Sequence, residues 1–546
     1  MMNGASWRLP ADYAPRGDNP LFLDTPSDVT YQPHVYELAT YLAKRSGART
    51  IIDIGCGNGN KLRAFENAHL NIICVDAAPA LEIARGYLKK PTFIAADLEH
   101  GVPPLPREAL DDAIVICADV IEHLRSPDRL AAALGEIARA CRYLLISTPD
   151  RTLARGLLDQ GPPLNEAHTM EWSADELGRF LCDRGLPTGF FIGHTINTDR
   201  HRVKSTILVI AGREARRPEP APAPRVAAVI HTYNERDIIG EVIDHLLQQG
   251  VEPHIFDNWS SDGSWEYLQS RKDIRSGRFP EAPADQYQWH AQLTHTAQYA
   301  ATLDVDWIMH HDADEIRSSP WQGVTIAEAI GHADALGYNA IDFTVIDFRF
   351  LHTEPDTVAP FQQNLRFFEF GRRAGHFEQV KGWKNTGTPV DLASTGGHDA
   401  AFTGRRVFPL KFLMKHYPLR SAQQAQQKIF AHRLPRSDTE KFRFGWHTQY
   451  DRFRAAAVSG WHRYKLLPWS APVFAQEYLV ERLSGIGLEE REQLVDFTPA
   501  SCRPRPRSST PRRHHRPASG GHQPFASVPG SGTSVNGGPG ATPDQV

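Results

Sequence analysis

A glycine-rich turn in the sequence TIIDIGCGNGN, residues 50–60, has the residue types and spacing of a ligand-binding loop. The apolar run before it predicts a buried strand, and Gly55, Gly57 and Gly59 predict a tight turn into a helix. Glycines let the backbone approach a ligand closely, and the first turn of a helix offers unpaired N–H groups. The spacing departs from the G-x-G-x-x-G of dinucleotide sites, and Asp53 is poorly suited to hold a pyrophosphate. The loop therefore indicates a cationic ligand and argues against an NAD-dependent enzyme.

Acidic residues end the apolar, strand-like runs that follow the loop. These runs close on Asp76, Asp97 and Asp119, and Asp53 lies in the strand before the loop. In a doubly wound sheet such strand ends lie at the ligand-binding edge, and Asp76 stands about 20 residues after the loop, the spacing at which an acidic residue reaches a ribose. A single strand-end aspartate is more often a helix cap or a turn residue. Several strand-end aspartates in succession favour one shared binding site.

This order of motifs resembles class I S-adenosylmethionine-dependent methyltransferases over roughly residues 31–212. The resemblance implies a Rossmann-like sheet that binds S-adenosylmethionine. It also implies the cofactor contacts: the methionine part is held by Asp53, Gly55, Gly57 and Gly59, the ribose by Asp76, and the adenine is flanked by Asp97 and Leu98. The segment from Asp119 to His123 corresponds to the motif that faces the sulfonium and the acceptor.

The segment 161–177, which contains NEAHTMEWS, is similar to a stretch that lies over the acceptor in methyltransferases of sugar and polysaccharide pathways. His168 is a candidate general base for a hydroxyl acceptor, because a neutral imidazole suits that task near pH 7. His123 is a second candidate catalytic residue. A histidine that only hydrogen-bonds a loop carbonyl is at least as good an interpretation of His168. Ser173 and Glu176 form a capping box, which predicts a helix after it.

A second set of strand patterns begins after a proline-rich spacer that ends at residue 224. One strand runs into the polar turn from Thr232 to Glu235, and the next ends at Asp257. Both resemble family 2 glycosyltransferases, and the resemblance extends over about residues 225–430. It implies a GT-A fold with a nucleotide-sugar pocket lined by Thr232, Asn234, Glu235 and Asp257.

A later strand-like run ends in the D-x-D motif of Asp312 and Asp314. Two carboxylates from one tight turn suit a hard divalent ion that also takes diphosphate oxygens, namely Mn²⁺ or Mg²⁺. Acidic triplets are also frequent on solvated loops. This one closes an apolar strand, which favours the metal site.

The remaining parts of the glycosyl-transfer site have more than one candidate each. In related enzymes a late histidine can complete the metal site, so His416 or His398 is a candidate ligand. An inverting transfer also needs a carboxylate base, for which Asp399 and Glu378 are the candidates.

Composition favours a cytoplasmic protein. The 546-residue chain has 41% hydrophobic and 23% charged residues and a net charge of −4, which argues against a protein built to coat nucleic acid. Its six cysteines include no C-x-x-C pair, as expected of reduced thiols. No stretch of about 18 apolar residues predicts a membrane span, so any membrane contact should be peripheral. From residue 501 the chain is rich in Pro, Arg, Ser and Gly and is predicted to be disordered.

The sequence therefore predicts an α/β protein with two doubly wound domains. The expected boundaries are a methyltransferase domain at 1–214, a linker at 215–224, a GT-A domain at 225–500 and a tail at 501–546. The expected function is a bifunctional transferase that works on a glycan or glycoconjugate, with one site for methyl transfer and one for metal-dependent transfer from a nucleotide sugar. The alternative is that one half has lost catalysis and recruits the shared substrate for the other.

Overall fold

The computed structural model describes residues 31–156, 158–159, 161–198, 200, 203–370, 379–436, 438–446, 458, 460–469, 479–480 and 483. The predicted tail and the candidate base Glu378 lie outside these residues. Five cysteines in the described part of the chain are free, and four of these are buried. Among the described helices, none is both long enough and apolar enough to cross a bilayer.

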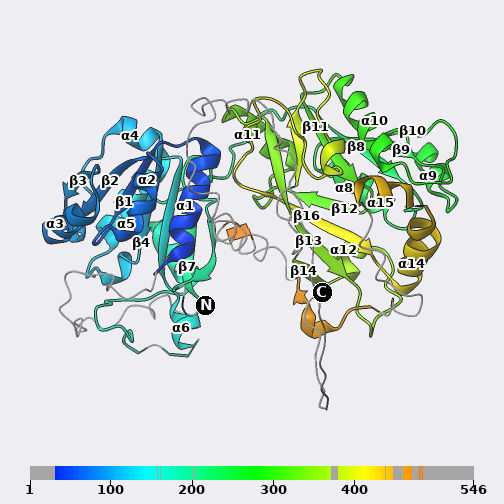
Figure 1. Cartoon of the computed structure of the whole chain (residues 1–546). Helices are drawn as coiled ribbons and strands as arrows, with labels where there is room; N and C mark the ends of the chain where they lie inside the picture. Colours follow the sequence, from blue (N-terminus) through cyan, green and yellow to red (C-terminus); the bar gives the residue numbers. More distant parts are fainter. Residues whose placement is uncertain are drawn as a thin grey trace, which may run out of the picture. The chain divides into compact units, whose positions relative to one another are not determined.

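Seven strands form the first sheet, in the order β3-β2-β1-β4-β5-β7-β6 (Figure 1). The first five strands in this order run parallel, whereas β7 runs antiparallel to both β5 and β6. The carboxyl ends of β1, β2 and β4 therefore meet at one edge, as the strand-end acids predicted. The strands are β1 (Thr50–Ile54), β2 (Asn71–Asp76), β3 (Thr92–Ala95), β4 (Ala113–Ala118), β5 (Tyr143–Pro149), β6 (Phe191–Ile196) and β7 (Lys204–Ala211).

Helices cover both faces of this sheet. On one face α1 contributes Leu38 to a core that contains Ile51, and on the other α5 contributes Leu134 to a core that contains Ile52. Successive residues of β1 thus alternate between two cores, which is the doubly wound arrangement that the sequence predicted. The helices are α1 (Pro33–Ser46), α2 (Arg63–Asn67), α3 (Ala78–Tyr87), α4 (Arg107–Asp111), α5 (Asp128–Ala140), α6 (Arg151–Arg155) and α7 (Ala174–Asp183), and the predicted capping box of Ser173 and Glu176 begins α7.

Ten strands form the second sheet, and its main path runs β10-β9-β8-β11-β15-β13-β14-β17. β10, β9, β8 and β11 are parallel, and the sheet becomes mixed beyond β11, where β15 pairs in the antiparallel direction. Two further strands, β12 and β16, pair with each other, and β16 also pairs with β13. The strands are β8 (Val226–Thr232), β9 (Val251–Asp257), β10 (Arg275–Arg278), β11 (Trp307–Asp312), β12 (Glu315–Ser318), β13 (Ala340–Arg349), β14 (Phe367–Phe370), β15 (Val380–Lys384), β16 (Phe412–Leu419) and β17 (Leu467–Pro468).

The central strand β8 is buried on both faces. Ala228 belongs to the core beneath α8, with Val242, whereas Val229 belongs to the core beneath α10, with Leu293. The α/β prediction therefore holds for this half as well. Its helices are α8 (Ile239–Gln248), α9 (Ser264–Ser270), α10 (Trp289–Ala301), α11 (Ile326–Ala335), α12 (Phe361–Asn364), α14 (Ala422–Gln426) and α15 (Asp438–Phe444), and a π-helical turn, η5 (Gln427–Arg433), follows α14.

Candidate functional site

The glycine loop turns at the carboxyl end of β1. Gly55, Gly57 and Gly59 have φ values of 81°, 54° and 71°, a region that residues with a Cβ rarely adopt. A Cβ on Gly55 would lie only 2.3 Å from Cγ2 of Val120. The loop therefore depends on glycine for its conformation and, at Gly55, for its close packing against the end of β4.

Asp76, the last residue of β2, ties the loop to the neighbouring strand. Its Oδ2 accepts a hydrogen bond from the Gly57 N–H (2.7 Å), and its Oδ1 accepts one from the Ala77 N–H (2.7 Å). Burial raises the pKa of this carboxyl above its usual value, although both N–H groups act in the opposite direction. Asp76 thus lies beside the glycine loop, and its ribose contact stays a prediction.

Two further predicted cofactor residues lie at neighbouring strand ends. Asp53 is buried within β1, and its Oδ2 accepts a hydrogen bond from the Tyr36 hydroxyl (3.0 Å). Asp119 follows β4 with a left-handed φ of 53°, and its Oδ1 accepts from Nε2 of Gln32 (3.0 Å). Both carboxylates are held by residues at or next to the start of α1, so this helix positions the acidic edge of the site.

Asp97 lies in a more exposed place after β3. Its Oδ1 accepts from the Glu99 N–H (3.0 Å), so the side chain caps a short 3₁₀ turn. Leu98 beside it is buried. Asp97 therefore has the capping role that its sequence context left open, and its predicted adenine contact stays a prediction.

Glu122, His123 and His168 come together at the carboxyl end of β4, with ligand atoms within 4.8 Å of one another. Glu122 is fully buried, and its Oε2 accepts a hydrogen bond from the Thr148 hydroxyl (3.0 Å). Burial and the neighbouring Asp119 raise the pKa of Glu122 well above its usual value. The sequence analysis included Glu122 only in the motif from Asp119 to His123 and gave it no role of its own, although its position beside His123 at a strand end was a usable signal.

The two histidines differ in their partners. His168 Nδ1 lies 2.8 Å from Oε1 of Glu171. The other ring nitrogen, Nε2, lies 2.9 Å from Nδ2 of Asn165. His123 Nδ1 lies 3.2 Å from the Ala167 carbonyl oxygen, and the two rings meet edge to face at 4.8 Å. Burial and His168 lower the pKa of His123, so its imidazole is neutral near pH 7.

In the second half, β8 and β9 pair in parallel so that Thr232 lies opposite Asp257. Asp257 is fully buried, and its Oδ2 accepts from the Ser260 N–H (3.0 Å). Burial raises the pKa of this carboxyl. Asn234 has a left-handed φ of 55°, and its Oδ1 accepts from the Ser261 N–H (2.8 Å). The two predicted nucleotide loops are thus joined to each other.

The D-x-D carboxylates are paired with lysines that come from elsewhere in the chain. Lys381 Nζ lies 2.8 Å from Oδ2 of Asp312, and Lys428 Nζ lies 2.7 Å from Oδ2 of Asp314. Lys428 also contacts Oε1 of Glu235 at 2.7 Å. Burial disfavours ionisation of both aspartates, but the lysines outweigh it and hold each pKa below its usual value. Sequence reasoning missed both lysines.

His416 on β16 faces the second aspartate of the motif. Its Nε2 lies 3.7 Å from Oδ1 of Asp314, and its Nδ1 lies 2.7 Å from Oδ1 of Asp347. Burial alone would lower the pKa of His416, but Asp314 and Asp347 raise it above its usual value. Of the two candidate histidine ligands, His416 is thus the one that adjoins Asp314.

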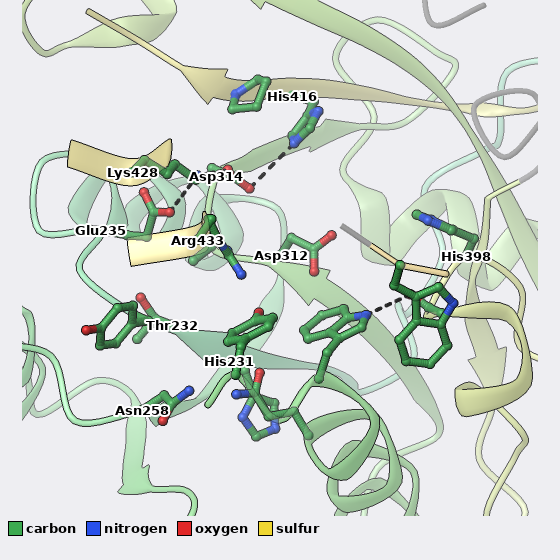
Figure 2. A pocket seen from close by; sticks show the side chains of 18 of the residues that line it. His231, Thr232, Glu235, Asn258, Asp312, Asp314, His398, His416, Lys428 and Arg433 are labelled. Atoms are coloured by element: carbon green, nitrogen blue, oxygen red, sulfur yellow. Dashed lines mark hydrogen bonds and ion pairs between the residues drawn. The ribbon is translucent and has the colours of Figure 1, made fainter. Parts of the chain in front are cut away.

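A cavity of about 350 Å³ opens where these elements meet (Figure 2). Figure 2 shows Asp312 and Asp314 at its centre, with Glu235 and Lys428 beside Asp314 and with Thr232 and Asn258 across the cavity. Among the predicted residues, the cavity is lined by Thr232, Glu235, Asp312, Asp314, His398 and His416. Asn234 and Asp257 do not belong to the lining.

Other residues of the cavity were placed differently by sequence reasoning. Asp399, a candidate base, does not belong to the lining, and its carboxylate pairs with Arg405. Trp446 lines the cavity with Trp289 and Tyr287, although an aromatic residue in a helical sequence pattern is ordinarily interpreted as core packing. The indole of Trp289 is fixed by a hydrogen bond from Nε1 to the Gly396 carbonyl (2.9 Å). The cavity therefore has an acidic centre and an aromatic wall.

Two family models match the chain. The model described as methyltransferase domain matches residues 52–143, and the model of glycosyl transferase family 2 matches residues 227–378. The chain therefore contains a region that matches a methyltransferase domain, followed by a region that matches family 2 glycosyltransferases. Both matched ranges contain the strand ends and turns described above, from the glycine loop to Asp119 and from Thr232 to Asp314.

Curated relatives resemble the methyltransferase domain. A probable S-adenosylmethionine-dependent methyltransferase of Mycobacterium tuberculosis is 32% identical over 147 residues, which cover 27% of this chain and 51% of the relative. A mitochondrial ubiquinone biosynthesis O-methyltransferase of Schizosaccharomyces pombe is 30% identical over 149 residues, covering 25% of this chain and 54% of that protein. The chain thus spans about half the length of these relatives. Among solved structures, the magnesium protoporphyrin IX methyltransferase of Synechocystis with bound SAH is 21% identical, with a TM-score of 0.26 over 33% of this chain and 83% of that chain.

Proposed function

We propose that the chain is a bifunctional transferase, with S-adenosylmethionine-dependent methyl transfer in the first half and glycosyl transfer from a nucleotide sugar in the second. The observation that carries the proposal is that each of two separate sheets gathers its motif residues at one carboxyl edge. The proposed domains are 1–214 and 225–500, joined by the linker 215–224. A glycan or glycoconjugate that both sites use would account for the fusion.

In the first half, the glycine loop, Asp53 and Asp76 hold the methionine and ribose parts of the cofactor. The acceptor is a hydroxyl group whose proton passes to His123 or His168. The acceptor oxygen then forms a bond to the methyl carbon while the S–CH₃ bond breaks, and its electron pair stays on sulfur to give S-adenosylhomocysteine. The lowered pKa of His123 supports this role, because a base must be unprotonated to accept the proton.

In the second half, the nucleotide lies against Thr232 and Glu235, in the loops that Asn234 and Asp257 shape. Asp312, Asp314 and His416 would hold a divalent ion, since His416 Nε2 lies 3.7 Å from Asp314 Oδ1 and carboxylate oxygens suit Mn²⁺ or Mg²⁺. When bound, Mn²⁺ or Mg²⁺ neutralises the diphosphate leaving group. Asp399 remains the predicted carboxylate base.

One observation favours a second candidate function for this half. Lys381 and Lys428 already neutralise both D-x-D carboxylates. A pocket neutralised in this way could bind a sugar nucleotide or a glycan without turnover and recruit the substrate for methylation. The two functions differ in a simple outcome: binding without release of nucleoside diphosphate supports the recruiting function.

The test uses the full chain and both cofactors. Calorimetry with S-adenosylmethionine should show an affinity loss of roughly 10–150-fold for Asp76→Ala, the equivalent of a charged hydrogen bond. Asp128→Ala, which removes a partly buried pair with Arg184 away from the glycine loop, is the control. A panel of nucleotide sugars with Mn²⁺ should identify a donor whose turnover is lost in EDTA and in Asp314→Asn. Unchanged S-adenosylmethionine affinity in Asp76→Ala, or turnover that survives EDTA, would contradict the respective half of the proposal.

A further inference from the structure

A cluster of potential metal ligands lies in the methyltransferase half, away from the D-x-D motif. Within the described residues, Glu122, His123 and His168 are the only group of three or more His, Cys, Asp or Glu side chains whose ligand atoms all lie within 4.8 Å of one another. We propose that these three side chains bind a divalent transition-metal ion next to the methyl-transfer site. Binding of the ion is independent of the proposed function, whereas the catalytic role of the ion rests on the proposed methyl transfer.

Both histidines are oriented in the manner of metal ligands. A ligating histidine usually donates its other ring N–H to a carboxylate or a backbone carbonyl, which fixes the tautomer and the ring orientation. His168 has such a partner in Glu171 (2.8 Å from Nδ1), and His123 has one in the Ala167 carbonyl (3.2 Å from Nδ1). In both rings Nδ1 is therefore engaged in the supporting contact, and Nε2 is the atom assigned to the ion.

Glu122 supplies an independent observation. Its side chain is completely buried, Oε2 accepts from Thr148, Oε1 receives no hydrogen bond from an N–H or hydroxyl donor, and the carboxyl group of Asp119 lies next to Glu122. A buried carboxylate oxygen without a partner costs free energy, because it has lost its water and received nothing in return. A cation bound between Oε1 and the two imidazoles would supply the missing partner.

The side chain of Asn165 must move before the ion can bind His168. Asn165 Nδ2 lies 2.9 Å from Nε2 of His168, the atom that the ion requires. Asn165 belongs to the loop that precedes His168 in the chain, and rotation of its side chain would free Nε2 or turn its amide oxygen toward the ion. Asn165 therefore competes with the metal, whereas Glu171 supports it.

The ligand set indicates what the ion does. Two imidazoles and one carboxylate suit Zn²⁺, Mn²⁺ or Fe²⁺, and three protein ligands leave open positions for an oxygen of the acceptor. An acceptor hydroxyl bound there loses its proton to solvent at a lower pH, because the ion stabilises the alkoxide or phenolate. That oxygen then takes the methyl group from the sulfonium. When the ion is bound, His123 and His168 hold it, and the proton that would otherwise pass to one of these histidines passes to solvent instead.

The experiment measures ion binding directly in the full chain. The background is Asp312→Asn/Asp314→Asn, which removes the predicted ion site of the other half. After treatment with a chelator, the protein is titrated with Co²⁺, and both its visible absorption and its metal content are recorded. We expect one bound ion per chain, and a loss of binding in His123→Ala and Glu122→Gln. Glu171→Gln, which removes only the supporting carboxylate, should weaken binding by about 10–100-fold.

Two controls separate a metal site from general damage to the fold. His194→Ala removes a histidine that also pairs with a carboxylate, Asp150 at 2.8 Å, and should retain the ion. Asn165→Ala should bind Co²⁺ at least as tightly as the background protein. The proposal is overturned if the background protein retains no Co²⁺, or if His123→Ala and Glu122→Gln bind it unchanged. Absence of S-adenosylmethionine binding in a protein that does bind Co²⁺ would overturn the proposed methyl transfer and leave the metal site standing.

Discussion

Lys428 lies 2.7 Å from Asp314, so the second carboxylate of the D-x-D motif is neutralised by a lysine that the chain supplies 114 residues later. The same ammonium group contacts Glu235, which lies in the predicted nucleotide turn. Lys428 is therefore a cation in the place where the proposed ion would bring positive charge. A divalent ion and Lys428 compete for Asp314, and this competition can be measured.

The first prediction concerns Lys428→Met. Removal of one partner from a buried ion pair leaves uncompensated charge and should destabilise the ion-free protein by about 3–5 kcal/mol. Mn²⁺ should then raise the Tm of the variant more than that of the parent, because the ion replaces the lost ammonium group. Lys384→Met, which removes an exposed pair with Asp334, is the control and should cost no more than about 1 kcal/mol. Equal Mn²⁺ effects on Lys428→Met and the parent would argue against an ion at Asp314.

The second prediction concerns acid stability. Burial opposes ionisation of Glu315, but Arg317 and Lys381 outweigh it and hold the pKa of this carboxyl far below its usual value. A depressed pKa in the folded state contributes stability above the unfolded value, and this contribution is lost as the pH falls. The free energy of unfolding, measured in urea, should therefore fall below about pH 4.5.

Glu315→Gln tests that assignment. The variant should be less stable at pH 7, because Arg317 and Lys381 lose a buried partner, and its stability should depend less on pH between 3 and 5. Asp304→Asn is the control, since Asp304 pairs with Arg225 in full exposure to solvent. A pH dependence that is as steep in Glu315→Gln as in the parent would assign the acid sensitivity to other carboxyl groups.

The site residues that could be predicted from the sequence are those marked by a local pattern of a strand followed by a turn. The glycine loop, Asp76, Thr232 and the D-x-D turn each stand at the end of an apolar run, and the parallel pairing of such runs brings their ends together. The partners of these residues were not predictable, because they depend on tertiary contacts. Lys381 reaches Asp312 across 69 residues of sequence, and no local pattern marks it.

His168 and Trp446 differ in how far their surroundings could be predicted from the sequence. His168 and Glu171 are only three residues apart, so their contact could have been read from the sequence. Trp446 could not be assigned in this way, because an aromatic residue in a helical pattern is equally compatible with core packing. Its place in the cavity wall depends on how the segment after α15 folds back toward Gly396.

The third prediction separates two kinds of glycine. Gly55 and Gly47 both have left-handed backbones, with φ of 81° and 74°. A Cβ on Gly55 meets Val120, whereas a Cβ on Gly47 meets nothing within 4 Å. Both alanine variants should lose about 1 kcal/mol from the backbone, but only Gly55→Ala should displace the loop and reduce S-adenosylmethionine affinity. Calorimetry and urea unfolding on the two variants measure both quantities. Equal losses of cofactor affinity would show that the loop packing at Val120 is irrelevant to the ligand.

The last prediction concerns the aromatic wall of the glycosyltransferase cavity. Trp446 and Trp289 line one side of the cavity that holds Asp312 and Asp314, and the sugar rings of an acceptor present flat apolar faces that can lie against an indole. Trp446→Ala should therefore weaken acceptor binding by roughly 2–13-fold, the equivalent of about 0.5–1.5 kcal/mol for an aromatic contact. The effect should appear in the KM for the acceptor, while the dependence on Mn²⁺ stays unchanged because no ion ligand is altered.

The control is Trp461→Ala. Trp461 packs edge to face on Phe350 at 5.5 Å and does not line the cavity, so its loss should lower stability without changing the KM for the acceptor. Acceptor KM and kcat are measured for both variants with the donor identified in the nucleotide-sugar panel. If Trp446→Ala changes the KM for the donor instead, the aromatic wall belongs to the nucleotide-sugar side of the cavity. If neither KM changes, Trp446 only packs against Gly396 and does not contact the acceptor.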